Sequence, residues 1–383
     1  MKVDYKNFVK VNNLPPEGSK IVVAMSGGVD SSVTAALLNQ AGYEVVGVTM
    51  KLYESKSKKN PKTCCSGVDI ADARNVCKKI GIKHYILNFE KKFENSVINE
   101  FAKSYINGET PIPCIRCNQT VKFTDLISFT KSINYSVLAT GHYIKRVETS
   151  DGINLFCAND NQKDQSYFLF ATTQEQLKIL RFPLGYFTKN EIRELASNFG
   201  LSVANKNDSQ DICFIPDGNY REFLKKKKFI ELSKGVIENL EGQILGTHDG
   251  IANYTIGQRK GIGIGGINGI NQNEPYYVLK INRKENKIIV GPKEKLAKYF
   301  IYLKEINFVS KKNPQKKFEA YIKVRSRRSL ISAKVKILSN KKKIATVELS
   351  KPEFGIAPGQ ACVFYNSNDK VIGGGWITSG EQK

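Results

Sequence analysis

The sequence of 383 residues contains no apolar run that approaches the roughly 20 residues needed to span a bilayer. Its start also lacks the apolar core of a signal peptide, and Asp4 and Glu17 distinguish it from an acid-poor transit peptide. We therefore expect a cytoplasmic protein that has no membrane partner. The eight cysteines are then expected to be reduced thiols, metal ligands or catalytic groups rather than structural disulfides.

Acidic residues are scarce relative to basic ones. There are 36 acidic and 59 basic residues, which gives a formal charge of +23. An excess of this size concentrates polyanions near the protein and favours a nucleic acid as partner. The alternative is a lysine-rich bias on a solvated surface. Lysine runs lie in the second half, at residues 225–228, 311–312 and 341–343.

The first half of the chain alternates short apolar segments with helical patterns. This alternation predicts a parallel sheet with helices on both faces, whose ligands lie beyond the carboxyl ends of the strands. The expected strands are residues 20–25, 45–52, 84–89 and 135–140, and the expected helices are residues 33–42, 70–80 and 93–106.

From about residue 276 the apolar residues alternate with period 2. Three hairpins are expected, over residues 276–291, 331–350 and 363–377. Residues 317–327 form a further expected strand. Several short strands separated by turn residues predict a small β-barrel. The second half therefore differs in architecture from the first.

Residues 26–32 (SGGVDSS) lie between an expected strand and an expected helix. Two glycines allow a tight turn close to a ligand, and the helix N-terminus offers amide donors to a phosphate. Asp30 is expected either to cap the helix or to hold a magnesium ion on the phosphates. The lysine of a Walker A motif is missing. The string resembles instead the PP-loop of the ATP pyrophosphatases, which cleave ATP between the α and β phosphates.

A CxxC motif at Cys114 and Cys117 has no second CxxC to complete a structural zinc site, and Cys213 stands alone. The motif is compatible with a redox pair, a metal half-site or a nucleophile. Arg116 and Lys122 are expected to favour a thiolate there. The adjacent Cys64 and Cys65 have no assigned role. Cys77, Cys157 and Cys362 are expected to be small core residues.

The whole chain resembles the tRNA-specific 2-thiouridylase family. The resemblance runs through AMSGGVDSSV, TPIPCIRCNQTVKF, ATGHY, KDQSYFL, DSQDICFI, GTHDGIANYTIGQRKGIGI, PYYVLKI, APGQACVFY and GGGWI. It implies an α/β fold in which a parallel-sheet PP-loop domain precedes a small central domain and a C-terminal β-barrel. We expect the domains at residues 1–209, 210–282 and 283–383.

This resemblance implies that the chain thiolates C2 of the wobble uridine in tRNAs for Lys, Glu and Gln. ATP, with Mg²⁺, adenylates the C2 oxygen, and a persulfide sulfur then displaces AMP. A cysteine desulfurase or sulfur-relay protein is the implied donor. Cys117 matches the catalytic cysteine and Cys213 the persulfide-bearing cysteine.

The other site residues are also implied by the resemblance. ATP binding is assigned to Ala24, Met25, Ser26, Gly27, Gly28, Val29, Asp30, Ser31, Ser32, Met50 and Gly141. Contacts with tRNA are assigned to Ile112, Pro113 and Cys114 beside the target base, and to His142, Lys163, Asp164, Gln165, Arg325, Ser326 and Gln360, with Arg327 added from the strand pattern.

Cys114 departs from the family pattern, in which many members carry Asp at this position. A carboxylate there can act as acid or base on sulfur, which a thiol does only weakly. The additional thiol raises an alternative in which Cys114, Cys117 and Cys213 ligate a [4Fe–4S] cluster whose fourth iron holds sulfide. We favour the persulfide route, because Cys213 matches the persulfide cysteine whichever residue stands at position 114.

The strand at residues 317–327 carries Lys317, Tyr321, Lys323, Arg325 and Arg327 at odd positions, which share one face. Cations contact phosphates and an aromatic or Arg plane stacks on a base, so this face is an expected RNA surface. Two other functions remain open: a ligase that attaches an amine to adenylated tRNA, and a non-catalytic RNA-binding protein with a zinc half-site.

Overall fold

The computed structural model describes most of the chain. The described residues are 2–53, 67–208, 212–215, 218–227, 233–264, 275–311, 314–326 and 329–380. Cys64, Cys65 and Arg327 lie outside them. No helix in these ranges is long and apolar enough to cross a membrane.

The first domain contains a five-stranded parallel sheet in the order β3-β2-β1-β4-β7. The sequence analysis predicts the parallel sheet and four of these strands, but not β7. Alternate residues of β1 bury in different apolar clusters, Val22 in one and Ile21 and Val23 in the other. Both faces of the sheet are therefore covered. The strands are β1 (Lys20–Ala24), β2 (Glu44–Lys51), β3 (Lys83–Asn88), β4 (Val137–Ala139) and β7 (Leu180–Arg181).

Helices on the two faces of the sheet come from different parts of the chain. The expected helix at residues 93–106 is divided into α4, the π-helical turn η1 and α5. The bounds are α1 (Tyr5–Val11), α2 (Val29–Gln40), α3 (Gly67–Ile80), α4 (Glu90–Phe93), η1 (Glu94–Ile98), α5 (Asn99–Ile106), α6 (Pro113–Cys117), η2 (Asn118–Lys122), α7 (Phe123–Ser132), η3 (Ser166–Phe168), α8 (Gln174–Ile179), α9 (Lys189–Asn198) and α10 (Tyr220–Lys226).

The C-terminal strands close into the expected barrel, because β12 pairs with both β15 and β17. On β13 the even positions Ala320 and Ile322 are buried in the barrel core and Tyr321 is exposed, which confirms the predicted alternation. The strands are β12 (Ala297–Phe308), β13 (Lys317–Lys323), β14 (Ile331–Ser339), β15 (Ile344–Phe354), β16 (Ala361–Tyr365) and β17 (Lys370–Thr378).

A hairpin of the first domain extends the barrel sheet, which the sequence analysis did not predict. Strands β5 (Lys145–Thr149) and β6 (Gly152–Phe156) pair with each other, and β6 pairs with β17 at Leu155 and Val371. Nearby, the Tyr167 hydroxyl donates to the carbonyl oxygens of Val324 and Ala361, at 3.2 and 3.0 Å. The barrel is thus joined to the first domain by both backbone and side-chain bonds.

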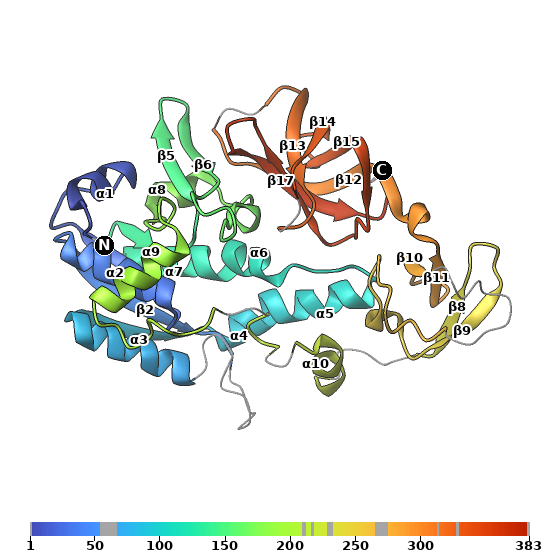
Figure 1. The fold of residues 1–383 in the computed structure, drawn as a ribbon, viewed down its shortest axis with the longest axis horizontal. Coiled ribbons are helices and arrows are strands. Elements are labelled where there is room, and N and C mark those ends of the chain that lie inside the picture. Colours follow the sequence, from blue (N-terminus) through green and yellow to red (C-terminus); the bar gives the residue numbers. More distant parts are fainter. Residues whose placement is uncertain are drawn as a thin grey trace.

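A separate four-stranded sheet lies between these two domains in the sequence and at one end of the molecule (Figure 1). Strands β10 and β11 pair across the expected domain boundary at residue 282, so we propose that the boundary follows β11 instead. Arg283 donates to Asn107 at the end of α5. The bounds are β8 (Gly235–Glu238), β9 (Ile244–His248), η4 (Ile251–Asn253), β10 (Tyr277–Asn282), β11 (Lys287–Gly291) and η5 (Lys293–Leu296).

Candidate active site and tRNA interface

The predicted phosphate loop forms a tight turn between β1 and α2. Gly27 has a φ of +72°, and a Cβ added there would lie 2.1 Å from the carbonyl oxygen of Asp69, so only glycine fits. Gly28 occupies the N-cap position of α2 and has no side chain with which to cap the helix. The first amides of α2 therefore remain suited to an anion.

The remaining residues assigned to ATP lie around this turn. A Cβ at Gly141 would approach the backbone nitrogen of Ser31 to 2.9 Å, so β4 delivers Gly141 directly against the loop. The backbone nitrogen of Met25 donates to Val48 of β2. Met50 is buried in the same apolar cluster as Cys117. The fold thus brings together the carboxyl ends of β1, β2 and β4, where a parallel sheet binds its ligands.

Asp30 is not a helix cap, because Gly28 occupies that position. Its Oδ1 accepts hydrogen bonds from the Tyr143 hydroxyl and from Lys189 Nζ, both at 2.7 Å. Burial, and then the charge of Asp30, raise the pKa of Tyr143, so the hydroxyl stays protonated and donates. The Lys189 side chain is only 8% exposed. Of the two expected roles of Asp30, the capping role is therefore wrong.

A second lysine supports the other side of the loop. Lys206 Nζ lies 2.9 Å from the carbonyl oxygen of Gly27, 2.6 Å from Asp69 Oδ1 and 2.5 Å from Asp72 Oδ2. Burial lowers the pKa of Lys206, but the two carboxylates outweigh burial and raise it above its ordinary value. The loop has no lysine of its own, yet Lys189 and Lys206 reach it from distant segments. No local pattern in the sequence identifies them.

The two candidate sulfur-handling cysteines contact one apolar cluster. Cys117 ends the short helix α6 and is 5% exposed, whereas Cys213 is partly buried against the same cluster. Cys114, at the start of α6, is exposed.

The iron–sulfur alternative requires three thiolates around one cluster. Within the described ranges, no three His, Cys, Asp or Glu side chains are grouped so that they could hold a metal ion. The described part of the chain therefore shows no preformed site for a single metal ion at Cys114, Cys117 and Cys213.

Phe214 anchors the chain immediately after Cys213. Its ring makes edge or tilted contacts with Phe93, Phe101 and Phe223, with centroids 5.2 to 5.7 Å apart. Phe214 is 1% exposed. Aromatic contacts of this kind stabilise by about 0.5–1.5 kcal/mol each beyond burial. Cys213 is thus adjacent to a firmly packed residue.

Arg116 is directed toward the barrel. Its guanidinium lies 4.5 Å from the centre of the Trp376 ring, and Nη2 lies 2.8 Å from Glu305 Oε2. Nη1 donates to Gln119. Arg116 therefore holds α6 against the barrel, and the expectation that it favours a thiolate stays a prediction.

The barrel also contacts the segment assigned to the target base. Gln360 Nε2 donates to the carbonyl oxygen of Thr110 at 2.8 Å, and the nitrogen of Thr110 donates to Pro358 at 2.7 Å. Thr110 lies two residues before Ile112. Gln360 and residues 112–114, predicted separately as tRNA contacts, are therefore brought together.

The tripeptide at residues 163–165 lies between the phosphate loop and the barrel. Lys163 Nζ pairs with Asp208 at 2.7 Å, and Gln165 Oε1 accepts from the nitrogen of Tyr143. The Asp164 side chain is 4% exposed and lies 3.5 Å from Lys323 Nζ. The Lys163 side chain, by contrast, is 36% exposed.

Arg325 follows β13 and donates to the carbonyl oxygen of Gly355. Gly355 in turn lies beside Gly257 of the central domain. Arg325 and the adjacent Ser326 therefore lie where the barrel and the central domain meet. The assignment of tRNA contacts to them stays a prediction.

His142 lies just past β4, with its ring against Phe123 and Phe182. Its Nδ1 is 2.8 Å from the Thr140 hydroxyl oxygen. Burial lowers the pKa of His142 to about 3, and the charge of Lys122 contributes. The imidazole is therefore neutral at pH 7, so any contact that it makes with tRNA is a hydrogen bond rather than an ion pair.

Acidification is expected to destabilise the protein through His142. The pKa of His142 in the folded state lies below the ordinary value of 6.5. The neutral imidazole therefore makes its full contribution to the free energy of unfolding above pH 6.5, and this contribution is lost as the pH falls toward 3. Between pH 7 and pH 5 the free energy of unfolding should fall by up to about 2 kcal/mol more than in a His142→Asn variant. Urea unfolding at both pH values measures this, and equal pH dependence in the two proteins contradicts it.

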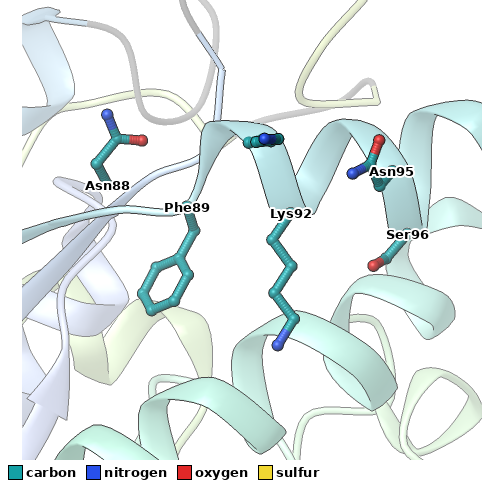
Figure 2. Close-up of a pocket in the computed structure, with 6 residues that line it drawn as sticks. Asn88, Phe89, Lys92, Asn95 and Ser96 are labelled. Atoms are coloured by element: carbon teal, nitrogen blue, oxygen red, sulfur yellow. The ribbon is translucent and has the colours of Figure 1, made fainter.

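A shallow hollow of about 470 Å³ lies on the surface beside α4, where β3 ends (Figure 2). Lys92 extends across it and pairs with Asp125 of α7 at 2.5 Å. None of the residues predicted for ATP, sulfur or tRNA lines it. Its lining consists of Asn88, Phe89, Lys91, Lys92, Asn95 and Ser96.

Three family models match consecutive parts of the chain. They are described as a tRNA methyl transferase HUP domain over residues 19–217, a tRNA methyl transferase PRC-barrel domain over residues 221–292, and an aminomethyltransferase beta-barrel domain over residues 298–377. The second model includes β10 and β11 together, in agreement with their pairing.

Similar curated proteins span nearly the whole chain. A protein of Roseobacter denitrificans named tRNA-specific 2-thiouridylase MnmA is 48% identical, over 96% of this chain and 96% of its own. Proteins with the same name from Wolbachia pipientis and Ehrlichia ruminantium are 50% and 47% identical, over 95% and 98% of this chain and 96% and 99% of theirs. The chain therefore belongs to the tRNA-specific 2-thiouridylase family.

Proposed function

We propose that this enzyme uses ATP to replace the C2 oxygen of a tRNA uridine with sulfur. The observation that carries the proposal is the combination of a phosphate loop without a lysine of its own and two cysteines, Cys117 and Cys213, on one apolar cluster. A loop of this kind suits pyrophosphate as leaving group, because several amides share its charge. Methyl transfer, which two family descriptions name, requires neither the loop nor the thiols.

The first step is adenylation. The uridine C2 oxygen attacks the α phosphate of ATP, the bond between the α and β phosphates breaks, and pyrophosphate leaves. The amides at the start of α2 bind the departing charge. Asp30 keeps Lys189 at the loop and is the expected ligand of Mg²⁺, which neutralises phosphate charge when bound.

The second step transfers sulfur. A donor persulfide passes its outer sulfur to Cys213 and leaves as a thiol. In one order, the outer sulfur attacks C2 and AMP leaves; Cys117 then attacks the inner sulfur and releases 2-thiouridine. In the other order, Cys117 first releases sulfide, which attacks C2. Both orders end with a Cys117–Cys213 disulfide that a thiol reductant must restore.

The substrate is proposed to be the wobble uridine of tRNAs for Lys, Glu and Gln, and the sulfur donor a cysteine desulfurase or sulfur-relay protein in the cytoplasm. The contact of Gln360 with Thr110 supports a base site beside residues 112–114. Lys163 and Arg325 are the cations proposed to contact phosphates. For this reaction we propose three domains: a catalytic domain, a central domain that ends after β11, and the barrel.

Thiolation in vitro tests the function. The enzyme is incubated with ATP, Mg²⁺, unmodified tRNA and a persulfide donor, and the nucleosides are analysed by mass. We expect 2-thiouridine, AMP and pyrophosphate in equal amounts. ADP and phosphate would contradict the loop assignment. An amine adduct instead of sulfur, or RNA binding without ATP cleavage, would each contradict the transfer of sulfur.

Binding of tRNA is expected to weaken steeply with salt, because cations that contact phosphates release counterions. An Arg325→Ala variant should bind tRNA more weakly and reduce the slope of log affinity against log salt by about 1. Lys341→Ala, in an exposed barrel turn, serves as the control. An unchanged slope for Arg325→Ala would mean that Arg325 does not contact a phosphate.

A further inference from the structure

The segment from Glu109 to Arg116 is attached to the barrel at both of its ends. At its start, Lys304 Nζ lies 3.8 Å from Glu109 Oε1. At its end, Arg116 Nη2 lies 2.8 and 3.1 Å from the two carboxylate oxygens of Glu305. Lys304 and Glu305 are consecutive residues of β12, so one short stretch of the barrel contacts both ends of the segment.

Helix α6, at the end of this segment, depends on such contacts, because a helix of five residues is not stable on its own. Successive residues of an α-helix point about 100° apart, so the direction of Arg116 fixes the direction of Cys117 next to it. The Arg116 guanidinium lies 4.5 Å from the centre of the Trp376 ring. Cys117 is only 5% exposed and packs in the apolar cluster of the first domain. A rotation of α6 that moves Arg116 off Trp376 therefore also moves the Cys117 sulfur.

Glu305 has an unusual backbone conformation for its residue type. Its φ is +51°, in the left-handed region, where a residue with a Cβ is strained. Six residues other than glycine have a positive φ within the described ranges, and four of them are Asn or Asp, which tolerate it best. Lys343, the fifth, lies in the turn between β14 and β15. Glu305 lies inside β12 instead, at an irregularity in its pairing with β17, and a glycine there would adopt the same conformation without strain.

We propose that Glu305 and Arg116 are positioning residues for sulfur transfer, and that the strained conformation at Glu305 is retained because its carboxylate fixes the rotation of α6. The irregularity in β12 redirects the Glu305 side chain. Its carboxylate holds the Arg116 guanidinium over Trp376, and Arg116 thereby fixes Cys117. Stability gives little reason for this arrangement, since an ion pair whose side chains are 28% and 48% exposed contributes little to it. The inference rests on the proposed function in one respect, namely that Cys117 takes part in sulfur transfer.

Separate measurement of the two chemical steps tests the positioning. In single turnovers with saturating ATP, tRNA and persulfide donor, Glu305→Gly and Arg116→Met should form 2-thiouridine about ten- to a hundredfold more slowly, because a displacement of about 1 Å costs that much rate. Pyrophosphate release should stay within about twofold of that of the unaltered enzyme, since the phosphate loop is a separate element. The double variant should be no slower than Arg116→Met, because Glu305 acts only through Arg116.

Lys343→Gly is the matched control, since it relieves a positive φ elsewhere in the barrel. It should form 2-thiouridine at the rate of the unaltered enzyme. Because glycine adopts a positive φ without strain, Glu305→Gly and Lys343→Gly should both unfold at urea midpoints no lower than that of the unaltered protein.

Trp376 is the only tryptophan of the chain, and its fluorescence supplies a readout that does not depend on activity. The emission of the ring responds to the cation placed over it. Arg116→Met should therefore change the emission of the tRNA-free protein. Glu305→Gly should change it in the same direction, and Lys343→Gly should leave it unchanged.

The competing explanation is that Glu305 and Arg116 merely stabilise the fold. Glu305→Gly would then unfold at a lower urea concentration than Lys343→Gly and would lose pyrophosphate release together with thiolation; either result overturns the inference. Additive losses in the double variant overturn it as well, because Glu305 would then act without Arg116. An unchanged Trp376 emission in Glu305→Gly has the same consequence.

Failure of the inference can be distinguished from failure of the proposed function. If Glu305→Gly forms 2-thiouridine at the normal rate while Cys117→Ser does not form it, the inference alone is wrong. If Cys117→Ser forms 2-thiouridine normally, the role of Cys117 in the proposed function is wrong, and the inference fails with it.

Discussion

Replacing Cys117 or Cys213 with serine is expected to lower thiolation by about a thousandfold or more, because a hydroxyl neither carries a persulfide nor attacks one. Adenylation does not involve either thiol. Each variant should therefore release one pyrophosphate per tRNA and then stop. In Cys213→Ser, AMP stays on the tRNA. In Cys117→Ser, AMP is released once if the persulfide attacks C2 directly, and stays on the tRNA if Cys117 must first release sulfide. Rapid-quench measurement of pyrophosphate and AMP checks this. Continued release of AMP in step with pyrophosphate would contradict sulfur as the group that displaces AMP.

Cys114 provides the matched substitution on the same helix. It is exposed at the start of α6, whereas Cys117 is buried at its end. A Cys114→Asp variant should keep its activity on the persulfide route, since it restores the residue more common in the family. If Cys114→Asp lost thiolation activity as completely as Cys117→Ser, the reaction would require the thiol of Cys114 as well as those of Cys117 and Cys213. Iron analysis of anaerobically purified protein complements this test, and full activity of iron-free protein with a persulfide donor is the expected result.

Removing the carboxylate of Asp30 is expected to abolish adenylation. In Asp30→Ala, Tyr143 loses its acceptor and Lys189 loses one of its two carboxylates. Of its two carboxylate partners Lys189 then keeps Asp208, which is not part of the loop. Loss of one charged group that organises a phosphate site typically lowers the rate by about a hundredfold or more. Pyrophosphate release in a single turnover measures the effect.

The same variant should bind tRNA nearly as tightly as the unaltered enzyme, because the loop and the basic surface are separate elements. Glu241→Ala, an exposed carboxylate in the turn between β8 and β9, is the control for charge. Thermal unfolding of Asp30→Ala shows whether the variant is folded, so that a loss of adenylation can be separated from a loss of the fold. A normal pyrophosphate burst in a folded Asp30→Ala protein would contradict the role of this carboxylate.

The phosphate loop could be predicted because its determinants are contiguous in the sequence. Gly27, Gly28 and the start of α2 follow one apolar strand, and local sterics decide their conformation. The barrel hairpins could be predicted for the same reason, since β14 and β15 or β16 and β17 are neighbours in sequence and carry a period-2 pattern. Interactions between residues that are close in sequence are sufficient to predict both the loop and the hairpins.

Long-range electrostatics were not predictable in this way. Lys189 begins α9, where its local pattern is that of an ordinary helix start, and its contact with Asp30 depends on the packing of α9 beside the loop. Arg116 was expected beside the thiols because it lies between them in sequence, but a five-residue helix projects it toward Glu305 and Trp376. Side-chain direction, rather than sequence distance, decides which groups meet.

The pairing of β6 with β17 has a consequence for synthesis of the chain. The partner of Phe156 in β6 is Lys370, which leaves the ribosome about 210 residues later. At about 5–20 residues per second, the edge of β6 waits roughly 10–40 seconds for its partner. During that interval a nascent chain can complete its ATP loop, but it lacks Gln360 and Trp376, which hold residues 110–117 in place. The growing polypeptide therefore acquires its nucleotide site first and the arrangement for sulfur transfer only when its last strand is added.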